Sequence, residues 1–182
     1  MGVGDKAGTS IACRQAPAFS PVARGGHREK RPLGAAYPDE GEMMATHETA
    51  GEGTRESPWV LTTPPGKSEY LAYRDEASDP PTLVVTVGKT ELRYQLRCLG
   101  DLQTMLTERG DWMPLGSADE QKPAAEGTVE AWGRSPDNPV GGWYGLKKGL
   151  RGRFANYVPP VMEALGMAEV EHEARNNRMR AI

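Results

Sequence analysis

Apolar and polar residues alternate in the first half of the chain in the pattern of a small antiparallel sheet. Residues 82–87 are all β-branched or leucine, and residues 90–97 alternate leucine or tyrosine with charged and amide side chains. The dipeptide Gly88-Lys89 between them is typical of a tight hairpin turn. A shorter apolar run at 59–63, closed by two prolines and a glycine, predicts a further strand. Because the polar residues of 90–97 share one side, that face of the sheet is expected to be exposed to solvent.

After the hairpin the spacing of apolar residues changes to that of helices. The chain is expected to form, in order, helices at 99–109, 126–134 and 154–165 and two short strands at 167–173 and 178–182. Gly110 is placed to end the first helix. Pro159-Pro160 either occupy the first turn of the last helix or kink it. The asparagine-containing turn between the two final strands predicts a second hairpin.

These elements predict an α+β fold. A small antiparallel sheet with one covering helix, at 99–109, leads into a helical segment that ends in a helix plus a β-hairpin. Residues 58–182 are expected to form a single globular domain. Residues 1–57 are rich in glycine and poor in large apolar side chains, so they are expected to be a disordered tail. Met43-Met44 offers an alternative start, in which the native protein lacks the first 42 residues.

The overall charge is close to balanced, with 22 Lys+Arg against 25 Asp+Glu and a net charge of −3. Any electrostatic function must therefore be local. No apolar run approaches the roughly 18–20 residues that cross a bilayer, and the N-terminus lacks the pattern of a signal peptide. With its two cysteines far apart in the sequence, the protein is expected to be cytoplasmic and reduced.

Glycines, aromatics and cations are concentrated in residues 141–157. Such a segment lets backbone amides and cations approach phosphates while aromatic rings stack on bases. The candidate residues for binding nucleic acid or another anion are Lys147, Lys148, Arg151 and Arg153, with Arg175 and Arg178 from the final hairpin. The expected partner on this hypothesis is a nucleic acid, and the protein is then a non-enzymatic binding module.

Two alternatives remain for the same segment. In the first, Trp143, Tyr144 and Tyr157 form an aromatic patch that binds a partner protein. In the second, the aromatics are core residues, the glycines allow close packing, and the cations lie on a solvent-exposed surface.

The sequence offers few candidate catalytic residues. We predict no catalytic residue, no cofactor and no metal site. Cys98 is expected to be a buried thiol and His172 an exposed strand residue, so a catalytic pair of the two is not favoured. An enzyme with a carboxylate-based site, using Glu126 and Glu130 on one helix face, is the third hypothesis. Gly66-Lys67-Ser68 matches the end of a P-loop, but the glycine required five residues earlier is absent.

Two resemblances follow from particular stretches. The helix, Leu-Gly, short strand, turn and short strand of residues 151–182 are similar to the end of a winged helix-turn-helix domain. That resemblance implies a recognition helix at 154–165 and a DNA-contacting wing. The run Gly127 to Leu146, with the ending Ala168 to Arg180, resembles a family of small bacterial proteins described as a domain of unknown function. It covers about residues 58–182 and implies one compact cytoplasmic module.

Overall fold

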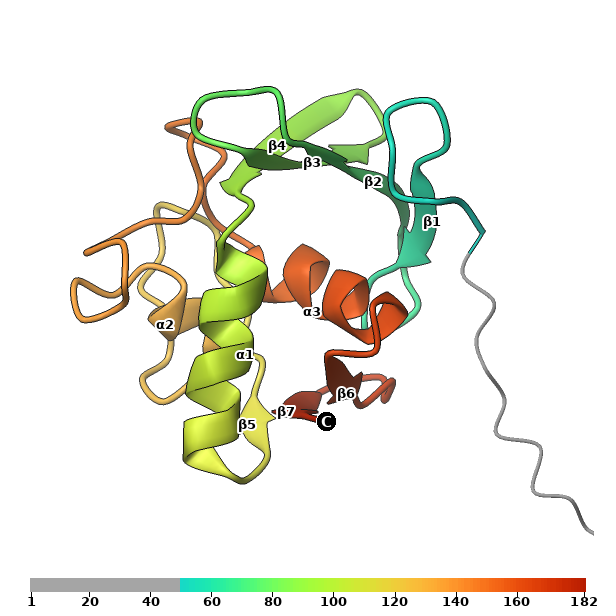
Figure 1. Ribbon diagram of the computed structural model, residues 1–182. Coiled ribbons are helices and arrows are strands. Elements are labelled where there is room, and N and C mark those ends of the chain that lie inside the picture. The colour runs from blue at the N-terminus through green and yellow to red at the C-terminus, as the bar shows by residue number, and fades with distance from the viewer. Residues whose placement is uncertain (1–49) are drawn as a thin grey trace, which may run out of the picture. The chain divides into compact units, whose positions relative to one another are not determined.

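The computed structural model describes residues 50–182 (Figure 1). Residues 1–49 of the predicted tail 1–57 and the alternative start at Met43-Met44 lie outside the described residues. The described part begins with a four-stranded antiparallel sheet in which the strand order follows the chain. Its strands are β1 (Trp59–Thr62), β2 (Glu69–Asp75), β3 (Thr82–Val87) and β4 (Thr90–Gln95).

The sheet confirms the predicted hairpin and adds a strand that we did not predict. β3 pairs with β4 up to the Val87–Thr90 register, so Gly88-Lys89 forms the turn. The additional strand is β2, which pairs with both β1 and β3. Alternate residues of β2 face inward, where Tyr70 and Ala72 are buried.

The chain enters β1 through an ordered segment, residues 50–57, that the sequence analysis assigned to the tail. The Val60 amide donates to the Ala50 carbonyl at 3.0 Å, and the Arg74 amide donates to the Gly53 carbonyl at 2.9 Å. Gly53 has φ 71°, and a Cβ there would lie 2.1 Å from Cζ2 of Trp59. The segment is therefore packed on the start of the sheet, and only glycine fits at position 53.

The helix beneath this sheet is α3 (Phe154–Ala164), which corrects the expectation that the helix after β4 covers it (Figure 1). α3 contacts β1 and β6, whereas α1 (Cys98–Arg109) contacts β7. The Tyr94 ring of β4 meets the Phe154 ring edge-on, with centroids 5.7 Å apart. α1 ends as predicted, with Gly110 in the left-handed conformation and its amide bonded to the Leu106 carbonyl.

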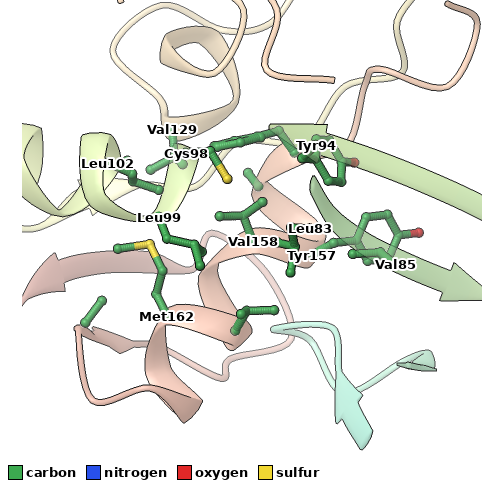
Figure 2. Close-up of a cluster of buried hydrophobic side chains, with 14 of the residues drawn as sticks. Leu83, Val85, Tyr94, Cys98, Leu99, Leu102, Val129, Tyr157, Val158 and Met162 are labelled. Carbon is green, nitrogen blue, oxygen red and sulfur yellow. The ribbon is translucent and has the colours of Figure 1, made fainter. Parts of the chain in front are cut away.

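α3 runs through both prolines to Ala164, so neither proline lies in its first turn. Most of its residues are buried, on several sides of the helix. Figure 2 shows Val158 and Met162 of α3 in one cluster with Leu83 of β3 and Leu99 of α1. The core is thus built around α3 rather than on one face of the sheet.

A second sheet closes the domain, with strand order β5-β7-β6. Its strands are β5 (Met113–Pro114), β6 (Ala168–Val170) and β7 (Arg178–Ala181), and the helix α2 (Val129–Trp132) lies between β5 and α3 in the sequence. The pairing of β6 with β7 confirms the predicted final hairpin. β5 joins through the register of Met113 with Met179 and was not predicted.

Candidate anion-binding cleft

The described residues enclose a cleft of about 860 Å³. Four segments form its walls: the β1–β2 connection, the chain after β5, the start of α3 and the tip of the final hairpin. Its basic residues are Lys67, Arg153, Arg175 and Arg178. No aspartate or glutamate belongs to the lining, so its charged residues are all cations, and they stand among neutral polar residues and apolar ones such as Pro64, Pro114 and Leu115.

The wall from the β1–β2 connection is a tight turn. The Gly66 amide donates to the Thr63 carbonyl at 2.7 Å, and Gly66 adopts φ 67°. The Thr63 amide also donates to the Ser68 carbonyl at 2.9 Å, which closes the loop. The turn connects β1 with β2 and holds Lys67 at the edge of the cleft.

The wall from α3 depends on Arg153, the residue that precedes the helix. Arg153 has φ 60°, an unusual conformation for a side chain larger than glycine. Its amide donates to the Ala118 carbonyl at 2.9 Å, and its Nε donates to Asp119 at 2.5 Å. The Asp119 carboxylate raises the pKa of Arg153 above its usual value. Asn156 and Tyr157, on the first turns of α3, complete this wall.

The hairpin wall is fixed by Asn177, which is buried. Its side chain accepts from the Glu173 amide at 2.7 Å and donates to the Glu173 carbonyl at 2.9 Å. Its backbone carbonyl accepts from the Leu115 amide at 2.9 Å, which ties the hairpin to the chain after β5. Asn176 takes the left-handed conformation, with φ 59°, so the tip turns and presents Arg175.

The four cations of the cleft are not equivalent. Arg153 pairs with Asp119 and Arg178 pairs with Glu171, each at 2.5 Å. Lys67 and Arg175 form no ion pair with any described residue. Their charges therefore remain available to a ligand.

The structure divides the residues proposed from the sequence into two groups. Arg153, Arg175, Arg178 and Tyr157 line the cleft, whereas Lys147, Lys148, Arg151, Trp143 and Tyr144 do not. Lys147 and Lys148 are exposed, without an ion-pair partner in the described part of the chain. The basic segment 141–157 is thus not one surface.

The predicted aromatic patch is corrected by burial. Tyr144 is 0% exposed and Tyr157 is 6% exposed, so neither ring is offered to a partner protein. The Tyr144 hydroxyl donates to Asp101 at 2.8 Å, and burial raises its pKa well above the usual range. Trp143 is half-buried, with the guanidinium groups of Arg134 and Arg151 at 4.5 and 4.6 Å from its ring. The aromatics of this segment therefore belong to the packing.

Part of the basic segment binds an acidic loop at residues 118–122. Arg151 Nη2 contacts Glu120 at 2.6 Å, and the Arg151 amide donates to the same carboxylate at 3.1 Å. Arg134 donates to the Ala118 carbonyl at 2.9 Å. Together with the pair of Arg153 and Asp119, these contacts use the charges of Arg151 and Arg153 inside the domain, whereas Lys147 and Lys148 keep theirs free among the described residues.

The arrangement of α3 does not support the resemblance to a winged helix. A recognition helix must leave one face free for the major groove, but α3 is buried on several sides. The arginines of the supposed wing are paired on the hairpin itself, Arg178 with Glu171 and Arg180 with Glu169. Both guanidinium groups also lie over the Trp112 ring, 5.3 and 4.8 Å from its centroid.

The residues considered for catalysis have structural partners. Cys98 is fully buried, and burial raises the pKa of its thiol well above the usual range. His172 Nε2 lies 2.8 Å from Glu163, and its Nδ1 lies 3.3 Å from the Pro64 carbonyl. Glu130 is fully buried, and its two oxygens accept from Arg134 and from the Ala155 amide. Its role is therefore to hold α2 against the start of α3.

Residues 50–182 contain no group of three or more histidine, cysteine or acidic side chains that suits a metal ion. Within the same part of the chain, none of the helices has the length and apolar character needed to cross a membrane.

Sequence reasoning missed Lys67, Asn156 and Asn177. The motif Gly66-Lys67-Ser68 was considered only as a P-loop ending, whereas it lies in the turn between β1 and β2, which places the lysine at the cleft. No sequence signal pointed to Asn156, which lies among apolar helix residues. The turn composition at 174–177 predicted a hairpin tip but not that Asn177 would be buried in it.

The chain belongs to a family of unknown function, DUF6855, whose family model matches residues 51–182. This finding confirms the resemblance noted for residues 58–182 and extends it to the segment packed on β1. Neither the curated proteins nor the solved structures contain a match to the chain.

Proposed function

We propose that this domain is a binding module whose ligand is a small anionic molecule held in the cleft. The observation that carries the proposal is the composition of the cleft lining, which combines four cations, two of them without an ion-pair partner among the described residues, with no carboxylate. A cleft lined by one sign of charge focuses its field and attracts ligands of the opposite sign. The net charge of the protein is negative, so the cleft is a local exception.

The shape of the cleft favours a small molecule over a nucleic-acid strand. Its volume of about 860 Å³ lies in the range of sites that enclose ligands of nucleotide or drug size. The cations stand on different walls, with Lys67 on one loop, Arg153 before α3 and Arg175 on the hairpin. A strand tracking along a groove needs a continuous row of cations instead.

The lining also supports binding rather than proton transfer. Besides the cations it offers hydroxyl and amide groups, among them Ser117, Asn156 and Asn177. It contains no histidine, cysteine, aspartate or glutamate that would act as a general base or nucleophile. The ligand is therefore held by charge-assisted hydrogen bonds to arginine and lysine.

Calorimetric titration of tripolyphosphate into the full chain tests this proposal. The variant Lys67→Ala/Arg175→Ala removes the two unpaired cations of the cleft and is expected to weaken binding at least about tenfold. The matched control Lys147→Ala/Lys148→Ala removes the same number of exposed charges outside the cleft and is expected to leave affinity nearly unchanged. Equal weakening in both variants contradicts a site in the cleft.

The nucleic-acid hypothesis is the rival in the same experiment. Its specific support is that Lys147 and Lys148 are exposed, with no ion-pair partner among residues 50–182. Tight binding of labelled single-stranded or duplex DNA or RNA, lost in Lys147→Ala/Lys148→Ala and retained in Lys67→Ala/Arg175→Ala, favours that rival. We expect the nucleic acids to bind weakly and without this pattern.

A further inference from the structure

Two of the arginines that line the cleft are held by carboxylates that do not line it. Arg153 Nε contacts Asp119, and Arg178 Nη2 contacts Glu171. Both carboxylates belong to neighbouring segments, the loop 118–122 and the strand-end of the final hairpin. The ligand of the cleft and these side chains therefore compete for the same guanidinium groups.

The two pairs are exposed enough to exchange. The side chains of Arg153 and Asp119 are 53% and 39% exposed and those of Arg178 and Glu171 are 49% and 24% exposed. Those of Arg134 and Glu130 are only 11% and 0% exposed. Exposed ion pairs contribute little to stability because water and salt screen them. A ligand phosphate can replace the carboxylate of such a pair without leaving a buried charge unpaired.

Exchange at Asp119 does not require its loop to unfold. Arg134 donates to the backbone carbonyls of Ala118 and Lys122, and Arg151 donates to the Glu120 carboxylate. The loop thus stays fixed from three points while the Asp119 side chain turns away. The exchange is a change of side-chain partners.

We infer that Asp119 and Glu171 act as internal competitors of the ligand and select for ligands that carry two or more phosphate groups. This inference rests on the proposed anion-binding function. A single phosphate can use the unpaired cations Lys67 and Arg175, which need not be drawn from a carboxylate. Additional phosphates gain affinity only by drawing Arg153 and Arg178 from their carboxylates, so di- and triphosphate esters are the ligand class that the cleft fits.

The competitors remain charged at neutral pH. Hydrogen bonds from Arg153 and Arg178 lower the pKa values of Asp119 and Glu171 below their usual range. Other charged groups that face these pairs are Lys122 and Arg134 at Asp119 and Asp111 at Arg178. Mild acidification therefore does not remove the competition, and substitution is the appropriate test.

The test compares tripolyphosphate and inorganic phosphate in calorimetric titrations of the full chain. Asp119→Asn and Glu171→Gln are each expected to tighten tripolyphosphate binding by about two- to fivefold, which is the scale of an exposed ion pair. Their effect on inorganic phosphate is expected to be much smaller. Thermal unfolding followed by circular dichroism verifies that each variant is folded.

Glu169→Gln is the matched control. Its partner Arg180 lies on the same face of the hairpin, with Nη2 2.6 Å from Glu169, and Arg180 does not line the cleft. The substitution removes the same charge as Glu171→Gln and is expected to leave tripolyphosphate affinity unchanged. Equal tightening by Glu169→Gln shows a general effect of net charge and overturns the inference.

The two proposals fail differently. If Lys67→Ala/Arg175→Ala abolishes binding but Asp119→Asn and Glu171→Gln do not strengthen it, the cleft binds anions without internal competition and only this inference is overturned. If tripolyphosphate binds to none of the variants nor to the parent chain, both proposals are overturned.

Discussion

The Tyr70 hydroxyl of β2 donates a hydrogen bond to the backbone carbonyl of Tyr157 in α3 at 2.8 Å, across 87 positions of sequence. The two rings also meet edge-on, with centroids 5.2 Å apart. Because Tyr157 lines the cleft, this contact fixes the α3 wall against the first sheet. The core and the candidate site are therefore mechanically linked.

Tyr70→Phe is expected to lower the free energy of unfolding by about 1–2 kcal/mol, because it leaves a buried carbonyl without its side-chain donor. Urea unfolding followed by circular dichroism measures the change. Tyr73→Phe, on the same strand, is the control, since the Tyr73 hydroxyl has no hydrogen bond to another described residue. A loss of equal size in Tyr73→Phe speaks against a special role for the Tyr70 contact.

Glu130→Gln is expected to be more severe, destabilising the domain by about 3–5 kcal/mol. The substitution leaves the half-buried Arg134 without its charge partner and weakens the bond to the Ala155 amide. The midpoint of urea unfolding reports the effect. Glu126→Gln, four residues earlier and exposed, should shift the midpoint little, and a similar shift in both variants contradicts this assignment.

Two glycines are expected to respond in opposite directions to alanine. A Cβ at Gly152 would lie 2.5 Å from the Glu120 backbone nitrogen, so Gly152→Ala should destabilise the domain by about 1–3 kcal/mol. Gly100 lies in α1 with open space around it, so Gly100→Ala should stabilise by about 0.5–1 kcal/mol. Thermal melts distinguish these signs, and destabilisation by Gly100→Ala is the outcome at odds with the structure.

Glu120 gives the clearest pH dependence. The hydrogen bond from Arg151 holds the pKa of Glu120 at about 2, against 4.5 for an unperturbed glutamate. Since the folded pKa is the lower one, the stabilisation is complete above about pH 4.5 and is lost as the pH falls toward 2. Free energies of unfolding measured between pH 5 and pH 2.5 should fall less steeply in Glu120→Gln than in the parent chain. Equal slopes contradict the assignment.

The sequence predicted those parts of the fold that depend on neighbouring residues. The turn at Gly88-Lys89 and the helix stop at Gly110 are set by local backbone preferences, and both are observed. β2 was missed because residues 70–73 are all apolar or aromatic, although only Tyr70 and Ala72 are buried, so the sequence shows no alternation there. The place of α3 beneath the sheet depends on contacts such as Tyr70 with Tyr157, which no local pattern encodes.

The candidate site was predictable only in part, for a similar reason. Arg153, Arg175 and Arg178 were proposed as anion-binding residues from composition, and they lie at the cleft. Arg151, chosen by the same reasoning, is consumed by Glu120, which lies 31 positions earlier. Net charge along a sequence window therefore overestimates the free charge of a surface when its counter-ions come from distant segments.

The most direct test of the proposed function is a titration of the full chain with tripolyphosphate, followed in two-dimensional amide NMR spectra. We predict that the shifted resonances cluster at the cleft, at the backbone amides of Lys67, Asn156 and Arg175 and at the side-chain amide of Asn177. Shifts confined to Lys147, Lys148 and their neighbours, or no shifts at millimolar ligand, would contradict the cleft as an anion-binding site.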